Sequence, residues 1–194
     1  PRPSGILGDL FFRSRPTLGQ RWLARLPLKT SIPCPSRLAE RIRLLTGHEP
    51  FCFKDPRFSY TLGAWRPFVK KAVFLCIFRH PGAVVTSILK QRKKVLHLRD
   101  FSINAEQAFK VWELMYSHIL DFHYPQGGDW VFMHYDQFLD GSACDRLVRK
   151  LSVKVDYDFP EASLNRSQRK TIVPSRILYQ YRKLCELAGY EERM

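Results

Sequence analysis

The chain has 194 residues, and its 32 Lys and Arg against 18 Asp and Glu give a formal net charge of +14. Residues 1–97 carry a net charge of +15, and residues 98–194 carry −1. Such an excess of positive charge in one half of a chain indicates an anionic partner, while the 45% of hydrophobic residues excludes intrinsic disorder. No apolar run approaches the roughly 20 residues that span a membrane, and no signal-peptide pattern opens the sequence, so we expect a soluble protein without a membrane span.

In the first part of the chain the pattern predicts helices and one short strand. A short helix is expected over residues 20–25. Ser36 has the character of an N-cap for an amphipathic helix that ends at Gly47. The apolar run 51–54 then predicts a strand, which Asp55-Pro56 would end.

The middle of the chain carries the strongest local signals. Residues 72–78 (AVFLCIF) form an uninterrupted apolar run, typical of a strand that is buried on both faces in a parallel sheet. Pro81 suits the first position of a helix that runs to about Lys94. Asn104 and Gln107 resemble the capping box that begins a further helix.

The last third of the chain predicts one more strand, over residues 130–135, followed by helices over residues 142–151 and 174–188. Strands that alternate with helices indicate an α/β fold. We expect a single domain over residues 1–194. The five cysteines and six histidines form no ligand cluster, which predicts reduced thiols, a cytoplasmic location and no metal site.

Two cationic segments follow predicted strands. Arg79 stands directly after the run 72–78, and Ser87 lies eight residues later on the predicted helix. In parallel sheets, ligands bind beyond the carboxyl ends of the strands, and a guanidinium with a hydroxyl beside a helix N-terminus suits a phosphate. The alternative is an Arg79 that pairs with a carboxylate and a Ser87 that bonds within its helix.

The second segment is residues 51–62 (FCFKDPRFSYTL). It places Lys54 and Arg57 at the end of another predicted strand, so we expect both cations on the same edge of the sheet, where Asp55 could orient either one. The alternative is a turn with solvated cations. Two strand ends that each carry a cation favour a convergent anion site.

These residues, KDPR followed by Trp65 and by a strand that ends in FRHP with a serine eight residues after its arginine, resemble the sulfotransferase family that uses 3′-phosphoadenosine 5′-phosphosulfate. The resemblance covers roughly residues 50–160, including the segment HYDQFLDG. It implies a P-loop-NTPase-like three-layer sandwich with a parallel sheet, and transfer of a sulfuryl group from the nucleotide to a hydroxyl or amine of an acceptor such as a carbohydrate or small molecule.

The resemblance also implies roles for individual residues. Arg79 and Ser87 would bind the 3′-phosphate of the donor, Arg57 would contribute to donor binding, and Lys54 would be catalytic by neutralising charge on the transferring group. A general base for the acceptor is required by the chemistry. The base could be Asp55 or His80, or both could be groups that only orient other side chains.

One part of the family pattern is not found. This family cradles the 5′-phosphosulfate in a phosphate-binding loop after its first strand, whereas residues 2–5 (RPSG) have some of the letters but follow no predicted strand. Either that loop lies upstream of Pro1 or the chain has lost it, so we expect a sheet that is incomplete at its N-terminal side. Two other functions stay open, a non-catalytic remnant of the fold and a basic nucleic-acid-binding protein, although the sequence has no nucleic-acid-binding motif.

Overall fold

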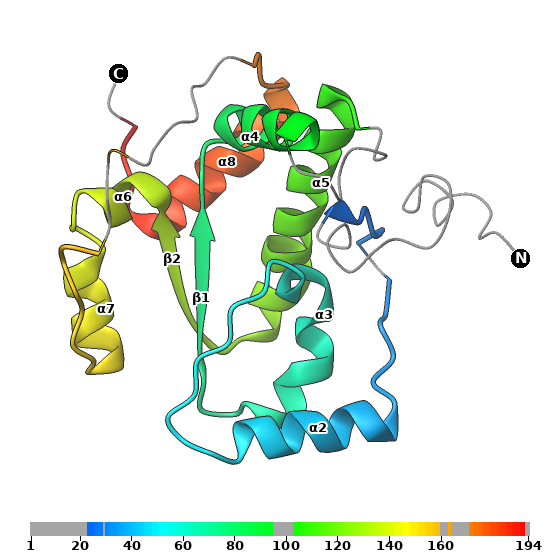
Figure 1. Ribbon diagram of the computed structural model, residues 1–194, viewed down its shortest axis with the longest axis vertical. Helices are drawn as coiled ribbons and strands as arrows, with labels where there is room; N and C mark the ends of the chain where they lie inside the picture. The colour runs from blue at the N-terminus through cyan, green and yellow to red at the C-terminus, as the bar shows by residue number, and fades with distance from the viewer. Residues whose placement is uncertain (1–22, 29, 95–102, 160–162, 164–170, 193–194) are drawn as a thin grey trace, which may run out of the picture. The chain divides into compact units, whose positions relative to one another are not determined.

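The computed structural model describes residues 23–28, 30–94, 103–159, 163 and 171–192 (Figure 1). The chain divides into two compact units, each built from two stretches. The first unit comprises Pro1–Ala72 with Gln91–Gly128, and the second comprises Val73–Lys90 with Asp129–Met194. The expectation of a single domain over residues 1–194 stays a prediction.

The second unit contains a parallel sheet of two strands. β1 (Val73–Phe78) pairs with β2 (Asp129–His134) in a register that runs from Val73 opposite Asp129 to Phe78 opposite His134. Figure 1 shows the two strands side by side. The α/β class, both strands and their parallel pairing are therefore confirmed.

The two faces of β1 differ in burial. Cys76 and Phe78 are buried on one face, whereas Leu75 and Ile77 on the other face are 41% and 46% exposed. The prediction that this strand is buried on both faces is therefore wrong for the described part of the chain. Leu75 and Ile77 are exposed because the hydrophobic core on their face of the sheet lies over β2. This core consists of Val131, Met133, Ala143 and Leu147.

Helices follow both strands of this unit. α4 (Pro81–Lys94) follows β1 and begins at the predicted proline. α6 (Tyr135–Leu139) follows β2 directly, and α7 (Cys144–Leu151) comes after it. α8 (Ser175–Ala188) matches the helix predicted over residues 174–188 and buries Ile177, Tyr181 and Leu184. It ends at Gly189, which is in the left-handed conformation.

The first unit is helical in its described residues. It contains α2 (Ser36–Thr46), α3 (Phe58–Trp65), the short helix η2 (Arg66–Phe68), α5 (Ala105–Ser117), the π-helix η4 (His118–His123) and η5 (Tyr124–Gln126). The capping box of Asn104 and Gln107 is confirmed. Ser36 is not the N-cap of α2, because Pro35 takes that position. Residues 24 and 25 are not helical, and residues 20–22 of that predicted helix lie outside the described residues.

Buried polar side chains join the elements of the first unit. The hydroxyl of Tyr60 donates to the carbonyl of Ala24 at 2.7 Å. Nε2 of His118 lies 3.1 Å from the carbonyl of Leu26, and Nε2 of His123 lies 3.0 Å from the carbonyl of Ser59. These bonds satisfy groups that would otherwise be costly to bury. Among the described residues no helix is long and apolar enough to cross a membrane.

Candidate functional site

Arg79 lies at the carboxyl end of β1, where its guanidinium packs against an aromatic ring. Because Phe78 pairs with His134, the next residues, Arg79 and Tyr135, leave the two strands at the same edge of the sheet. The guanidinium carbon of Arg79 lies 4.6 Å from the centroid of the Tyr135 ring. This cation–π contact holds the charge at the edge of the sheet where parallel folds bind their ligands.

The helix that carries Ser87 is tied to a distant segment of the chain. The hydroxyl of Thr86 donates to the carbonyl of Gly82 at 2.8 Å and lies 3.0 Å from the hydroxyl oxygen of Thr171. A Cβ added to Gly82 would lie 2.9 Å from the carbonyl oxygen of Thr171, so only glycine allows this close approach. Ser87, the next residue, is half-buried and faces another side of α4, since successive helix residues are rotated by about 100°.

His80, one of the two candidate bases, packs among aromatic rings. Its ring lies edge-on to that of Tyr181, with 5.1 Å between the centroids. The Tyr181 hydroxyl in turn lies 3.1 Å from Nε2 of His134, and burial raises the pKa of Tyr181. This packing indicates a structural contribution of His80 behind Arg79.

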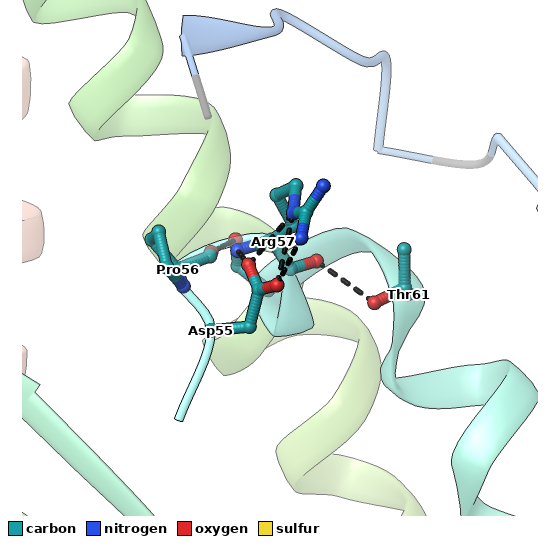
Figure 2. Close-up of polar contacts among 5 residues, drawn as sticks. Asp55, Pro56, Arg57 and Thr61 are labelled. Carbon is teal, nitrogen blue, oxygen red and sulfur yellow. Dashed lines mark hydrogen bonds and ion pairs between the residues drawn. The ribbon is translucent and has the colours of Figure 1, made fainter. Parts of the chain in front are cut away.

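The prediction that Lys54 and Arg57 end a strand of the same sheet is wrong. Residues 51–54 form no strand, and the segment leads into α3 through a turn closed by Asp55. The Asp55 carboxylate accepts a bond from the backbone N–H of Arg57 at 2.8 Å, which is a turn that competes with strand formation. Figure 2 shows this turn, together with the bond from the Thr61 hydroxyl to the carbonyl of Arg57.

Arg57 and Asp55 also form an ion pair through their side chains. Nε of Arg57 donates to both carboxylate oxygens of Asp55, at 2.8 and 3.0 Å, and the terminal Nη2 donates as well. Hydrogen bonding to Arg57, assisted by the nearby charge of Lys54, lowers the pKa of Asp55, and the same pairing raises the pKa of Arg57. Of the two cations that Asp55 could orient, the structure therefore pairs it with Arg57.

Aromatic contacts attach this loop to α3. The ring of Phe53 lies 5.4 Å from the rings of both Phe51 and Trp65, and Phe58 packs edge-on against Trp65 at 5.1 Å. Lys54 is exposed between these anchored positions. The loop thus presents a lysine to solvent on a backbone that its neighbours hold in place.

The site residues predicted from the sequence fall into two sets. Arg79 and Ser87 belong to the second unit, and Lys54 and Arg57 belong to the first. Sequence reasoning missed Tyr135 as the partner of Arg79, although it directly follows the strand that pairs with β1. The sequence also carries Arg166, Arg169 and Lys170, which could reach an anionic donor or acceptor or belong to a solvated loop, and all three lie outside the described residues.

No family model, curated protein or solved structure matches this chain.

Proposed function

We propose that this chain is a sulfotransferase that uses 3′-phosphoadenosine 5′-phosphosulfate, with Arg79 and Ser87 as the ligands of the donor's 3′-phosphate. The observation that supports this proposal most is the position of Arg79. It follows a parallel strand, its guanidinium stacks on Tyr135, and a helix begins two residues later at Pro81. A held guanidinium at such an edge can give a phosphate two parallel charge-assisted hydrogen bonds.

In the proposed reaction, the sulfur atom of the donor forms a bond to the acceptor oxygen. The bond from sulfur to the bridging oxygen breaks, and its electron pair leaves with 3′-phosphoadenosine 5′-phosphate. The acceptor's proton passes to a base. By analogy with phosphoryl transfer, the transition state is loose, so the protein contributes positioning and charge stabilisation. Lys54 has the catalytic role in this proposal, because its exposed ammonium can offset charge on the transferring group.

The contacts of Asp55 and His80 indicate how well each could act as the general base that takes the acceptor's proton. A carboxylate whose pKa is lowered by an ion pair is a weaker base, which disfavours Asp55. His80 packs edge-on against Tyr181. Neither side chain is therefore favoured as the base. Arg57 is proposed to contribute to donor binding only through its effect on the loop that carries Lys54.

The proposal includes the larger features that the resemblance implies. These are a P-loop-NTPase-like three-layer sandwich and an acceptor with a hydroxyl or amine group, such as a carbohydrate or a small molecule. A metal ion has no part in it. A cytoplasmic location is also included, on the ground that the five cysteines lie far apart in the sequence and form no ligand cluster, which suits reduced thiols.

One observation favours a second candidate function, a nucleotide-binding protein of this fold without transfer activity. Arg57 is bound to Asp55 by several hydrogen bonds, so the KDPR motif has a structural use that is independent of any ligand. In that case Arg79 would still bind the nucleotide, and Lys54 would have no catalytic effect.

The test measures binding and transfer separately. Binding of 3′-phosphoadenosine 5′-phosphate is followed by calorimetry for the wild type, Arg79→Ala, Ser87→Ala and the control Arg182→Ala, a change of an exposed residue on α8. We expect Arg79→Ala to weaken binding by about tenfold or more, Ser87→Ala by less, and the control by nothing measurable. Absence of binding to the wild type contradicts the proposal. Sulfuryl transfer that Lys54→Ala abolishes, with binding retained, selects the enzyme over the non-catalytic candidate.

A further inference from the structure

A second cationic site lies within the second unit, at the other end of β2 from Arg79. It is a hollow of about 350 Å³ beside the outer edge of β2, lined by Trp130, Val131, Arg146, Arg149 and Lys150. Three of these five residues are cations, and all three come from α7. Because they are spaced at i, i+3 and i+4, they form one row along the helix.

Three contacts fix this row along the edge of the strand. Arg146 donates from Nη2 to the carbonyl of Phe132 at 3.1 Å and from Nη1 to the carbonyl of Ala188 at 2.5 Å. Four residues later, Nζ of Lys150 lies 2.6 Å from the carboxylate of Asp129. The row is thus attached at both ends, so part of the entropy cost of ordering it for a ligand has been met by folding.

Positive charges outnumber negative charges around the hollow. Arg146, Arg149 and Lys150 contribute three positive charges. Two negative charges lie beside them: Asp129, which pairs with Lys150, and Asp145, which lies one turn before Arg149 on α7 and accepts a hydrogen bond from Tyr157, so the net charge is still positive. Arg146 uses two of its five N–H donors on carbonyls, and Lys150 uses one of three on Asp129, so both keep donors for a ligand. Arg149 is exposed, and no ion pair to it is found in the part of the chain that the structure describes.

We propose that this hollow binds a tetrahedral oxyanion, carried as a phosphate or sulfate ester by a molecule about the size of a monosaccharide. Charge complementarity selects the anion, since a net positive wall attracts one and an arginine recognises its oxygens. The hollow is shallow and largely open to solvent, and its volume exceeds what a free ion needs, so it leaves room for the group that carries the oxyanion. The site is separate from the proposed donor site, and the inference does not depend on the proposed function.

The experiment uses inorganic phosphate, glucose 6-phosphate and glucose as probes in about 0.15 M salt. Binding is followed by the amide NMR signals of Trp130 and Val131 in the wild type, Arg149→Ala and the control Arg182→Ala. Because Arg149 and Arg182 are both exposed, neither change should disturb folding, which the remaining amide signals verify. We expect Arg149→Ala to weaken glucose 6-phosphate binding by about tenfold and the control to leave it unchanged.

The arms of the experiment distinguish the two sources of the oxyanion. Tighter binding of glucose 6-phosphate than of inorganic phosphate supports the proposed ester, whereas equal affinities overturn it in favour of the free ion. Glucose should not bind. Arg79→Ala should retain the binding of glucose 6-phosphate. The experiment therefore tests this hollow even if the proposed donor site binds no nucleotide. Equal affinity of the wild type and Arg149→Ala, or no change in the Trp130 and Val131 signals, overturns the proposal.

Discussion

Arg79 and Tyr135 are neighbours because β1 and β2 are in parallel register, and the guanidinium of Arg79 lies 4.6 Å from the centroid of the Tyr135 ring. The ring therefore positions the cation without being a charge partner. A cation–π contact at a partly exposed site contributes about 0.5–1 kcal/mol. Loss of the ring should leave Arg79 in place along the chain but free to adopt more rotamers.

Tyr135→Leu should weaken the binding of 3′-phosphoadenosine 5′-phosphate by about two- to fivefold. Tyr135→Phe keeps the ring and should bind nearly as well as the wild type. Calorimetric titration of both variants checks this expectation. If the phenylalanine variant loses as much affinity as the leucine variant, the Tyr135 hydroxyl and not its ring is what matters.

The close approach of Thr171 to Gly82 predicts opposite effects of two glycine substitutions. Gly82→Ala places a Cβ 2.9 Å from the carbonyl of Thr171 and should lower the free energy of unfolding by about 1–3 kcal/mol. Gly63→Ala, inside α3, meets nothing within 4 Å and should raise it by about 0.5–1 kcal/mol. Urea denaturation measures both, and equal effects would contradict the packing described for the first turn of α4.

The ion pair of Asp55 and Arg57 should contribute modestly to stability. Their side chains are 27% and 40% exposed, so the solvent screens the pair, and we expect a coupling energy of about 0.5–1 kcal/mol. A double-mutant cycle with Asp55→Asn and Arg57→Met at neutral pH measures this coupling, and about 1 M salt should reduce it. Because the pKa of Asp55 is lowered, the contribution is present above the ordinary Asp pKa and is lost as the pH falls through the lowered value. A coupling that salt leaves unchanged would argue against an electrostatic origin.

His123 should make the first unit sensitive to acid. Burial lowers its pKa from 6.5 to about 4, so the unfolded chain takes up a proton between these values while the folded chain does not. The free energy of unfolding should therefore fall as the pH falls from about 6.5 to about 4, by up to roughly 3 kcal/mol. His118 has a pKa shifted in the same direction by burial.

His123→Gln keeps a donor for the carbonyl of Ser59 but cannot titrate, so it should flatten the dependence of stability on pH in this window. His48→Gln, a change of an exposed histidine, is the matched control and should leave the slope as in the wild type. Urea denaturation across the pH range gives both slopes. Slopes of equal steepness in all three proteins would show that other groups cause the acid sensitivity.

Sequence reasoning succeeded where the signal was local. The apolar run before Arg79 and the proline after it predicted β1 and the first residue of α4, and Asn104 with Gln107 predicted the start of α5. In each case the residues that determine the element lie within a few positions of one another. Their side chains favour a strand or a helix start without help from distant parts of the chain.

Sequence reasoning failed where contacts between residues far apart in the chain determine the structure. The apolar residues 51–54 read as a strand, but Phe53 packs on Trp65, and the Asp55 turn begins a helix instead. The burial of Leu75 depends on what lies over the sheet, which the composition of one strand cannot reveal. The contact of Arg79 with Tyr135 required the register of two strands that are more than fifty residues apart in the sequence.

Recognition of the 3′-phosphate of an adenine nucleotide by Arg79 is the claim on which the proposed function depends. The most direct measurement compares the affinities for 3′-phosphoadenosine 5′-phosphate and for adenosine 5′-phosphate, which lacks that phosphate, in the wild type and in Arg79→Ala. We predict that the wild type prefers the 3′-phosphorylated nucleotide by about tenfold or more and that Arg79→Ala binds the two nearly equally. A wild type without this preference, or an Arg79→Ala variant that keeps it in full, would contradict the claim.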